Sequence, residues 1–357
     1  MDGRSVQRSQ GGFPSRKAAR DRLNEILVEL RKGTYQRPTG LTVEAYLADE
    51  WLPFKRTQVR PTTFDSYEGI MRCHVVPRLG SRRLVDVTPR DLERLYEELR
   101  AGGLSPRSVQ YVHVLVRGAF RRAVERGQLA RNPADVVRPA RATGAGDRKE
   151  MRTWSAELVR AFLTFVQEDR LSPLWHMAFH TGMRRGELLG LRWEDVDLEA
   201  RKLSIRQQLV ASCGYEVRVH APKTGRSRQI WLDTQTAAVL KRWKARQAAE
   251  RLEWGSAWND SGLVFTREDG RYHHPDRISK VFERLTAAAG LPRIRLHDAR
   301  HTHATLLLQA GTHVKVVAER LGHSSIVVTM DTYSHAIPSM EAEAADRVAA
   351  LVGLETL

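Results

Sequence analysis

The sequence has very little cysteine, no long apolar run and no excess of acidic residues. Its 357 residues include two cysteines, Cys73 and Cys213, which lie far apart and have no Cys/His pair at the spacing of a zinc site. This argues against a disulfide-stabilised domain and favours a reducing compartment. No run approaches membrane-spanning length, and the polar, basic N-terminus lacks the apolar segment of a signal peptide. We therefore expect a cytoplasmic protein without membrane contact.

Positive charge is abundant. Lysine and arginine number 58 against 42 aspartates and glutamates, which gives a formal net charge of +16 and an isoelectric point near 10.3. The excess is about +5 in residues 1–40, +6 in 41–150 and +5 in 151–357. A basic tail on a neutral enzyme would give an uneven distribution. An even excess suits a protein that contacts a polyanion along its length, so nucleic acid is the expected partner.

Three segments differ in pattern. Residues 1–40 begin with a polar stretch and continue into a predicted helix with an apolar stripe, which Ser15 caps and Gly33 ends. Residues 41–140 are predicted to be all-helical, because successive periodic segments start at proline and end near glycine. Residues 141–150, with glycine and small residues, are predicted to be a linker.

Residues 151–357 have a mixed pattern. Helices are expected on both sides of three predicted strands, KLSIRQQLV, EVRVHAPK and SRQIWLD, which should form one small sheet. Thr224 and Gly225 are predicted to turn the last pair of strands. Residues 340–357 have a helix-favouring composition with an apolar stripe. The predicted fold class is mainly α with a small β-sheet (α+β).

Four short segments in this last part suit chemistry at a phosphodiester. They are TGMRRGELLGLRW from Thr181, APKTGRSRQIWLD from Ala221, LHDARHTHATLLLQAG from Leu296 and LGHSSIVVTMDTYSH from Leu321. Together they offer two arginines, a lysine, two histidines and a tyrosine. A phosphodiester under attack accumulates negative charge on its non-bridging oxygens, which guanidinium groups bind bidentately while they stay charged. This set suits catalysis without a metal.

In order, spacing and flanking residues, these segments resemble the catalytic domain of the tyrosine recombinase (phage integrase) family. The resemblance implies that Arg184 and Arg300 bind the scissile phosphate and that His323 contacts it as well. It implies that Tyr333, ten residues after His323, is the nucleophile and forms a 3′-phosphotyrosine with DNA. Religation then needs no ATP, and no metal or other cofactor is expected.

The resemblance also implies the proton-transfer roles. Lys223, on the predicted turn, would protonate the 5′-oxygen leaving group, with Lys202 and Arg226 as nearby rivals. His297 would transfer a proton or orient the phosphate beside Tyr333. Because a tyrosine ordinarily titrates near pH 10, we expect nearby positive charge to favour its phenolate or a nearby group to accept its proton.

Other residues of the motifs have expected supporting roles. Glu187, three residues after Arg184, should hold that guanidinium in place, and Arg185 should form a surface salt bridge. Four histidines have no place in the pattern and are expected to be structural or solvent-facing: His301, His303, His313 and His335. The alternative for these histidines is that they bind a metal. It is disfavoured because no pair of carboxylates accompanies them.

The helical region 41–140 resembles the core-site DNA-binding domain of these recombinases. One predicted helix has a basic edge with almost no acidic residue of its own, so we expect phosphate contacts from Arg107, Arg117, Arg121 and Arg122. Residues 1–40 resemble the end of the family's arm-site-binding domain without its first strands, so this domain is expected to be partial.

As a whole, the resemblance implies an integrase of a phage or integrative element. It implies a C-shaped clamp on double-stranded DNA attachment sites, with the catalytic domain over 151–357 and its last helix reaching a neighbouring protomer. A homotetramer would exchange strands through a Holliday junction, and an excisionase and a DNA-bending host factor are further candidate partners. The alternatives are a Xer-type dimer-resolution recombinase, a type IB topoisomerase and a catalytically silent DNA-binding regulator.

Overall fold

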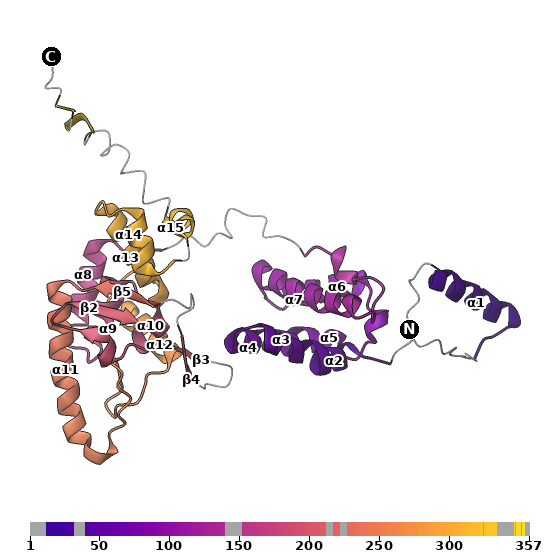
Figure 1. Cartoon of the computed structure of the whole chain (residues 1–357), viewed down its shortest axis with the longest axis horizontal. Coiled ribbons are helices and arrows are strands. Elements are labelled where there is room, and N and C mark those ends of the chain that lie inside the picture. The colour runs from indigo at the N-terminus through magenta and orange to yellow at the C-terminus, as the bar shows by residue number, and fades with distance from the viewer. Residues whose placement is uncertain are drawn as a thin grey trace. The chain divides into compact units, whose positions relative to one another are not determined.

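The computed structural model describes two compact units. The described residues are 12–31, 40–139, 152–211, 217–221, 227–323 and 325–333, with 346, 348–350 and 352–353. The chain divides at residues 148/149 (Figure 1). Within these residues, none of the helices combines the length and the apolar composition that crossing a membrane requires. Each unit has its own hydrophobic core.

The first helix, α1 (Arg16–Arg31), begins as its sequence predicts. The Ser15 hydroxyl accepts a hydrogen bond from the Ala18 amide at 3.1 Å, which satisfies one of the free amides of the first turn. The apolar stripe of α1 is on the surface, where Leu23 and Leu27 remain 54% and 44% exposed. The helix is therefore confirmed, and its apolar face is not part of a core among the described residues.

The predicted all-helical character of residues 41–140 is confirmed over the residues described there. Its elements are α2 (Val43–Tyr46), η1 (Leu47–Trp51), α3 (Leu52–Gln58), α4 (Pro61–Ile70), η2 (Met71–Val75), α5 (Val76–Leu79), η3 (Leu84–Asp86), α6 (Pro89–Ala101), α7 (Pro106–Glu125) and η4 (Pro133–Asp135). The starts of α6 and α7 follow local chemistry. Thr88 and Asp91 form a reciprocal capping box, Ser105 caps the Ser108 amide, and a proline follows each cap.

Two widened helical turns in this unit precede prolines. In η1 and η2, the amide that follows the turn donates to a carbonyl five residues back instead of four. Pro53 and Pro77 come one residue later. Proline has no amide hydrogen, and its ring crowds the carbonyl four residues before it. The wider turn removes that conflict, so the helix passes each proline without a break.

The second unit is mixed, as predicted. Its helices are α8 (Ala156–Phe165), α9 (Ser172–Thr181), α10 (Arg185–Leu189), η6 (Trp193–Asp195), α11 (Thr234–Trp254), η7 (Gly255–Ala257), α12 (Pro275–Ala288), α13 (Leu296–Gln309), α14 (Val314–Leu321) and α15 (Ile326–Tyr333). Its strands are β1 (Val196–Asp197), β2 (Lys202–Ile205), β3 (Gln208–Ala211), β4 (Val217–His220) and β5 (Arg228–Trp231). The α+β class is therefore confirmed.

The predicted strand pairing is wrong. The described strands form two antiparallel sheets, β1–β2–β5 and β3–β4, instead of one sheet with its last two strands paired. The first predicted strand is divided into β2 and β3. Leu203 of β2 lies opposite Ile230 of β5, and both are buried. Burial of this cross-strand pair fixes a pairing between segments far apart in sequence, which local turn chemistry does not reveal.

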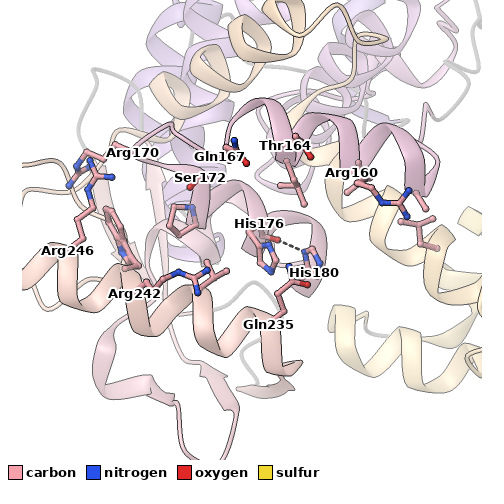
Figure 2. A pocket seen from close by; sticks show the side chains of 17 residues that line it. Arg160, Thr164, Gln167, Arg170, Ser172, His176, His180, Gln235, Arg242 and Arg246 are labelled. Atoms are coloured by element: carbon pink, nitrogen blue, oxygen red, sulfur yellow. Dashed lines mark hydrogen bonds between the residues drawn. The ribbon is translucent and has the colours of Figure 1, made fainter.

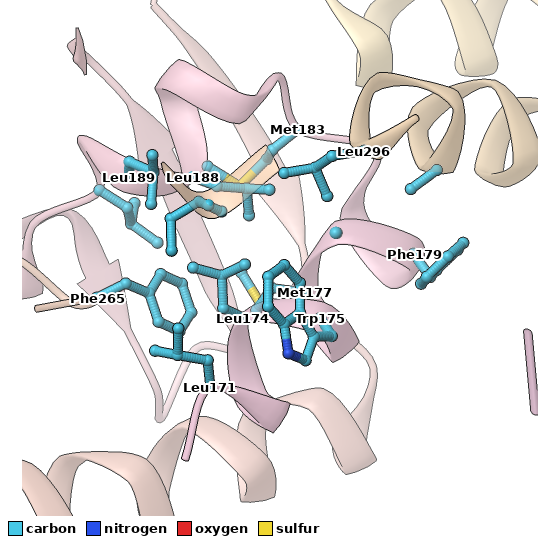
Figure 3. Packing of buried hydrophobic residues seen from close by; sticks show 14 of the residues in the cluster. Leu171, Leu174, Trp175, Met177, Phe179, Met183, Leu188, Leu189, Phe265 and Leu296 are labelled. Atoms are coloured by element: carbon cyan, nitrogen blue, oxygen red, sulfur yellow. The ribbon is translucent and has the colours of Figure 1, made fainter. Parts of the chain in front are cut away.

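The core of the second unit is built around α9. Figure 3 shows Leu174, Trp175, Met177 and Phe179 of this helix packed among buried side chains from other elements. These helix residues are at most 3% exposed. Complete burial of a large apolar side chain contributes about 1.5–3 kcal/mol. Helix α9 is therefore packed against other core elements on several sides, and this packing fixes the position of its C-terminal end.

A smaller cluster joins α13, α14 and α15. Ala304 and Leu308 of α13 pack with Val317 and Leu321 of α14 and with Tyr333 of α15. Figure 1 shows these three helices next to one another. The segments with the predicted histidines, second arginine and tyrosine therefore form one packed structure.

Candidate active site

The first arginine follows the end of α9. Gly182 ends that helix with φ of +62°, a conformation that favours glycine. A Cβ at this position would lie 2.6 Å from the His303 ring and 2.9 Å from Leu321, so a larger residue does not fit. The chain then extends through Arg184, which precedes α10. The packed end of α9 thus fixes the position of the Arg184 backbone.

Glu187 holds Arg184 as predicted. Its carboxylate accepts from the Arg184 amide at 2.8 Å and from the Arg184 guanidinium at 2.9 Å. Arg228 of β5 donates to the same carboxylate twice, at 2.9 and 2.7 Å. Burial alone would raise the pKa of Glu187, but hydrogen bonds and charges from Arg228 and Arg184 outweigh it and lower the pKa to about 2. Glu187 is therefore a buried anion between two cations.

Arg300 is buried and bonded to backbone carbonyls. It donates to Gly182 O at 2.8 Å and to Leu321 O at 2.6 Å. Arg184 donates to the adjacent Gly322 O at 3.3 Å, so both arginines contact the C-terminal end of α14. That end carries partial negative charge, which favours cations. Burial and the charge of Arg184 lower the pKa of Arg300 to about 9, and the guanidinium stays charged at neutral pH.

His323 follows these carbonyls directly. Its Nδ1 lies 2.7 Å from the buried hydroxyl of Thr329 in α15. Burial and the charges of Arg300 and Arg184 lower the pKa of His323 to about 4, so the ring is neutral at neutral pH. When Thr329 donates its hydroxyl proton to Nδ1, Nε2 carries the ring proton and can donate to an anion.

Tyr333 is fully buried at the end of α15. Its side chain is 0% exposed, and its hydroxyl lies 2.8 Å from Nδ1 of His301. Burial raises the pKa of Tyr333 to about 12, although the charge of Arg300 opposes this change. Positive charge therefore favours the phenolate as expected, but burial outweighs its effect in this structure. A group that accepts the phenolic proton is required for attack at neutral pH.

The histidine beside Tyr333 differs from the predicted one. His297 was expected there, but it is exposed and has no hydrogen bond within the described part of the chain. Its ring centroid lies 5.1 Å from that of His301, which occupies the place beside the hydroxyl. Of the two predicted places for His301, structural or solvent-facing, the half-buried contact excludes the second, and the contact with Tyr333 itself was not predicted. The i, i+4 spacing of the two histidines was the available signal, because it places them on one face of α13.

Arg228 was also missed by sequence reasoning. It donates to Glu187 and, through Nε, to Arg320 O at 3.0 Å. A Cβ on Gly322 would lie 2.8 Å from the Arg228 side chain, so the two are tightly packed. No local motif indicates this position, because its partners are distant in sequence.

Lys223, the predicted general acid, lies outside the described residues, as does its rival Arg226. The other rival, Lys202, lies on β2 opposite Trp231 of β5.

The remaining residues of the motifs have structural contacts. Arg185 forms the predicted salt bridge, with Asp276 at 3.0 Å. His303 is buried between Phe179 O, at 2.7 Å from Nδ1, and the Arg320 guanidinium, at 3.1 Å from Nε2. His313 caps α14, and His335 lies outside the described residues. Among the residues that are described, no three His, Cys, Asp or Glu side chains are grouped as metal ligands would be.

The basic edge of α7 is partly neutralised. Arg117 pairs with Asp135 of η4 at 2.6 Å. Arg122 is 3.4 Å from Glu125 and lies over the Phe54 ring. The helix has almost no acidic residue of its own, as predicted, but Arg117 finds its partner in another element. Of the four arginines predicted to contact phosphate, Arg107 and Arg121 are exposed and have no ion pair among the described residues.

A cavity of about 700 Å³ lies elsewhere in this unit, between α8, α9 and α11 (Figure 2). Arg160, His176, His180 and Arg242 are among the residues that line it. No residue of the arginine–tyrosine cluster lines this cavity. It is therefore separate from the candidate active site.

The cluster can bind an anion and attack it. A guanidinium has five N–H donors, of which the carbonyl and carboxylate contacts use only some. Arg300 is a buried cation whose hydrogen bonds go to carbonyls, so a phosphate would supply its missing countercharge. The tyrosine hydroxyl beside this arginine is a nucleophile of the required type. The arrangement suits displacement at a phosphodiester.

Comparison with known proteins agrees with this chemistry. The model of the "Phage integrase family" matches residues 155–339, and that of the "Phage integrase, N-terminal SAM-like domain" matches 45–100. A "Tyrosine recombinase XerC-like" protein of Caldanaerobacter subterraneus is 30% identical over 352 residues, which cover 93% of this chain and 89% of the relative. The "ICEBs1 integrase" of Bacillus subtilis is 30% identical over 292 residues, 81% and 78% of the two chains.

A solved structure has the same fold. The Tn1549 transposon integrase, in complex with a circular intermediate DNA, aligns with a TM-score of 0.71 at 23% identity. The alignment covers 86% of this chain and 99% of that one. At this identity the likeness establishes the arrangement of the fold only.

Proposed function

This chain belongs to the phage integrase family and is a site-specific tyrosine recombinase, and we propose that it integrates and excises a mobile element. The observation that supports this most strongly is the convergence of Arg184, Arg300, His323 and Tyr333 at the end of α14. These side chains come from segments up to about 150 residues apart, and their contacts depend on the folded second unit.

In the proposed reaction, Tyr333 attacks a DNA phosphodiester. Arg184 and Arg300 bind the non-bridging oxygens, with His323 donating a further hydrogen bond. Tyr333 becomes joined to the 3′-phosphate, while Lys223 protonates the departing 5′-oxygen. The attack of another strand's 5′-hydroxyl on the phosphotyrosine rejoins the DNA without ATP. His297, exposed near this cluster, is proposed to orient the phosphate.

The DNA-binding parts follow the same proposal. Residues 41–140 act as the core-site-binding domain, 141–150 as linker and 151–357 as the catalytic domain, which together close as a clamp on duplex DNA. Arg107 and Arg121 are the best candidates for phosphate contacts in α7, because both are exposed. Residues 1–40 act as a partial arm-site-binding segment.

The proposed assembly is a homotetramer that joins two attachment sites and passes through a Holliday junction. Residues 340–357 link neighbouring protomers in this proposal. Most of them lie outside the described residues, and Val348 and Val352 are 59% and 62% exposed. An exposed apolar pair at i, i+4 suits a contact with another surface. An excisionase and a DNA-bending host factor complete the set of proposed partners.

A Xer-type dimer-resolution recombinase is the second candidate, favoured by the name of the Caldanaerobacter relative. The genomic flanks distinguish the two functions. Direct repeats that flank the coding sequence and end in a tRNA gene indicate a mobile element.

The test uses a nicked suicide duplex copied from the recombined junction. Wild-type protein should form a covalent adduct that survives a denaturing gel, in the presence of EDTA as well. Tyr333→Phe removes only a hydroxyl, so it should bind this duplex and form no adduct. Tyr272→Phe changes an exposed tyrosine on the same unit and should behave as wild type. An adduct in Tyr333→Phe would refute the assignment of the nucleophile.

A further inference from the structure

The hydroxyl of Tyr333 has a single hydrogen-bond partner among the described residues. That partner is Nδ1 of His301, at 2.8 Å, and the two rings are 5.8 Å apart at an angle of 54°. His301 comes from α13 and Tyr333 from α15, so the contact joins two helices. It also places a basic nitrogen within hydrogen-bond distance of the oxygen that would form the new bond to phosphorus.

Packing around Tyr333 limits where its proton can go. The ring packs against Ala304 and Leu308 of α13 and Val317 and Leu321 of α14, and no part of the side chain is exposed. Bulk water therefore does not reach the hydroxyl in this structure. A proton that leaves the hydroxyl within this packing has His301 as its nearest acceptor.

The surroundings keep His301 neutral. Burial and the adjacent His297 lower the pKa of His301 to about 4. The charged and titratable groups that act on His301 are His297, Asp298, Arg300 and Arg295 at the start of α13, Tyr333 of α15, and His323 between α14 and α15. A neutral imidazole has an unprotonated nitrogen, which is the state that a base requires.

One neighbouring group favours a proton on His301. Asp298 is three residues before His301 and acts on it as a negative charge, against the effect of the arginines. Asp298 is itself held by two hydrogen bonds from the Arg295 side chain, at 3.1 and 2.7 Å. The carboxylate is therefore fixed near the imidazole.

We propose that His301 is the general base that takes the proton of Tyr333 during strand cleavage, an inference that rests on the proposed recombinase function. As the tyrosine oxygen bonds to phosphorus, its proton passes to Nδ1 of His301. The bond between phosphorus and the 5′-oxygen breaks, and the general acid supplies a proton to that oxygen. In religation the incoming 5′-hydroxyl returns its proton to the deprotonated general acid as its oxygen bonds to phosphorus. The bond between phosphorus and the tyrosine oxygen breaks, and His301 returns its proton to that oxygen.

His301 suits this role better than His297. His297 is exposed and has no hydrogen bond among the described residues, so it is free to face bound DNA. His301 already contacts the reacting oxygen. In this proposal the two histidines on one face of α13 have different roles. His297 orients the phosphate, and His301 takes the proton of Tyr333.

The experiment measures single-turnover adduct formation on a suicide duplex with a 5′-bridging phosphorothiolate. This leaving group departs without a proton, so the general acid does not limit the rate and the attack step is isolated. His301→Asn is the decisive variant, because its amide oxygen can occupy the place of Nδ1 and accept the tyrosine hydrogen bond but cannot take up the proton. His301→Ala removes both functions. His313→Asn is the matched control, since it keeps a capping residue at an exposed position of α14.

We expect both His301 variants to form the adduct about 10²–10⁴-fold more slowly than wild type, with unchanged gel-shift affinity for the duplex. Between pH 6 and 9, the wild-type rate should be nearly constant. The His301→Asn rate should rise about tenfold per pH unit, because Tyr333 must then ionise before attack. Such a slope does not arise from a purely structural role.

Three results would overturn the inference. A wild-type rate in His301→Asn would make the residue only a positioning group, and a faster rate would make it a lock on the nucleophile. An unchanged pH profile in the slowed variant would exclude proton transfer. Failure of the recombinase proposal looks different, since wild type itself would then form no adduct that depends on Tyr333.

Discussion

Replacing the buried carboxylate of Glu187 by an amide tests the framework of the candidate site. Glu187→Gln keeps the shape of the side chain but removes its charge. The carboxylate oxygens accept four hydrogen bonds, two from Arg184 and two from Arg228, and the Glu187 side chain is 0% exposed. An amide offers one oxygen to these donors and points its own N–H groups at the others. Two guanidinium groups lose a fully buried anionic partner.

The expected loss of stability is large. Removing one partner of a buried ion pair costs about 3–5 kcal/mol, because the remaining charge is left uncompensated. The lowered pKa of Glu187 leads to a similar value for the loss of stability. A fall from 4.5 to about 2 on folding corresponds to about 3 kcal/mol. We therefore expect Glu187→Gln to lower the free energy of unfolding of the second unit by about 3–4 kcal/mol at pH 7.

The pH dependence gives a second, independent check. The folded-state pKa of Glu187 is lowered, so its stabilisation is complete above pH 4.5 and is lost as pH falls toward about 2. The difference between wild type and Glu187→Gln should therefore be greatest at neutral pH and shrink over this acid range. A raised pKa would give the opposite trend.

Urea unfolding followed by tryptophan fluorescence measures this effect. Every tryptophan except Trp51 lies in the second unit, so the signal mainly reports that unit. Glu199→Gln is the control, since Glu199 pairs with Lys241 at 3.4 Å while its side chain is 89% exposed. A loss below about 1 kcal/mol is expected there. If Glu187→Gln costs no more than Glu199→Gln, the carboxylate does not hold the two arginines together.

Further predictions concern the reaction and its assembly. Lys223→Ala should block cleavage of ordinary DNA and be rescued by a 5′-bridging phosphorothiolate, whereas Arg300→Ala should not be rescued; equal behaviour of the two would reject Lys223 as the general acid. Wild-type affinity for duplex DNA should fall steeply with salt, by about 0.9 log units per log unit of salt for each phosphate neutralised. Arg121→Glu should weaken binding more than Lys241→Glu, and a flat salt response or equal losses would contradict the proposed α7 contact. Deleting 340–357 should preserve binding to a single site and abolish recombination between two sites; recombination at the normal rate would exclude the tail as the link between protomers.

Local signals in the sequence predicted the parts of the fold that depend on neighbouring residues. Ser15, Thr88 and Ser105 cap helices where a hydroxyl precedes a periodic segment. The contact of Glu187 with Arg184 follows from a spacing of three residues at the start of a helix. In both kinds of feature the hydrogen-bonded residues are three positions apart, within one helical turn, so the local sequence is enough to predict the contact.

The parts that could not be predicted depend on distant residues. Arg228 forms its hydrogen bonds with Glu187 although 41 positions separate them in the sequence. Strand β2 pairs with β5 because their apolar residues pack together in the core. His297 and His301 lie on one face of α13, and the packing of α13 with α14 and α15 decides that His301 is the one that contacts Tyr333. Asp135, which neutralises Arg117, lies 18 residues further along the chain in a separate turn. Counting the acidic residues of the helix alone therefore does not reveal this ion pair.

The long-range contacts of the arginines also govern when a newly made chain can act on DNA. Arg300 bonds to Gly182 across 118 positions, and Arg184 bonds to Gly322 across 138. Closing such loops costs conformational entropy that only the packed unit repays. During synthesis, Tyr333 follows both arginines from the ribosome. A chain whose synthesis has not yet passed Tyr333 therefore lacks the nucleophile and cannot join itself to DNA, even when both arginines have emerged.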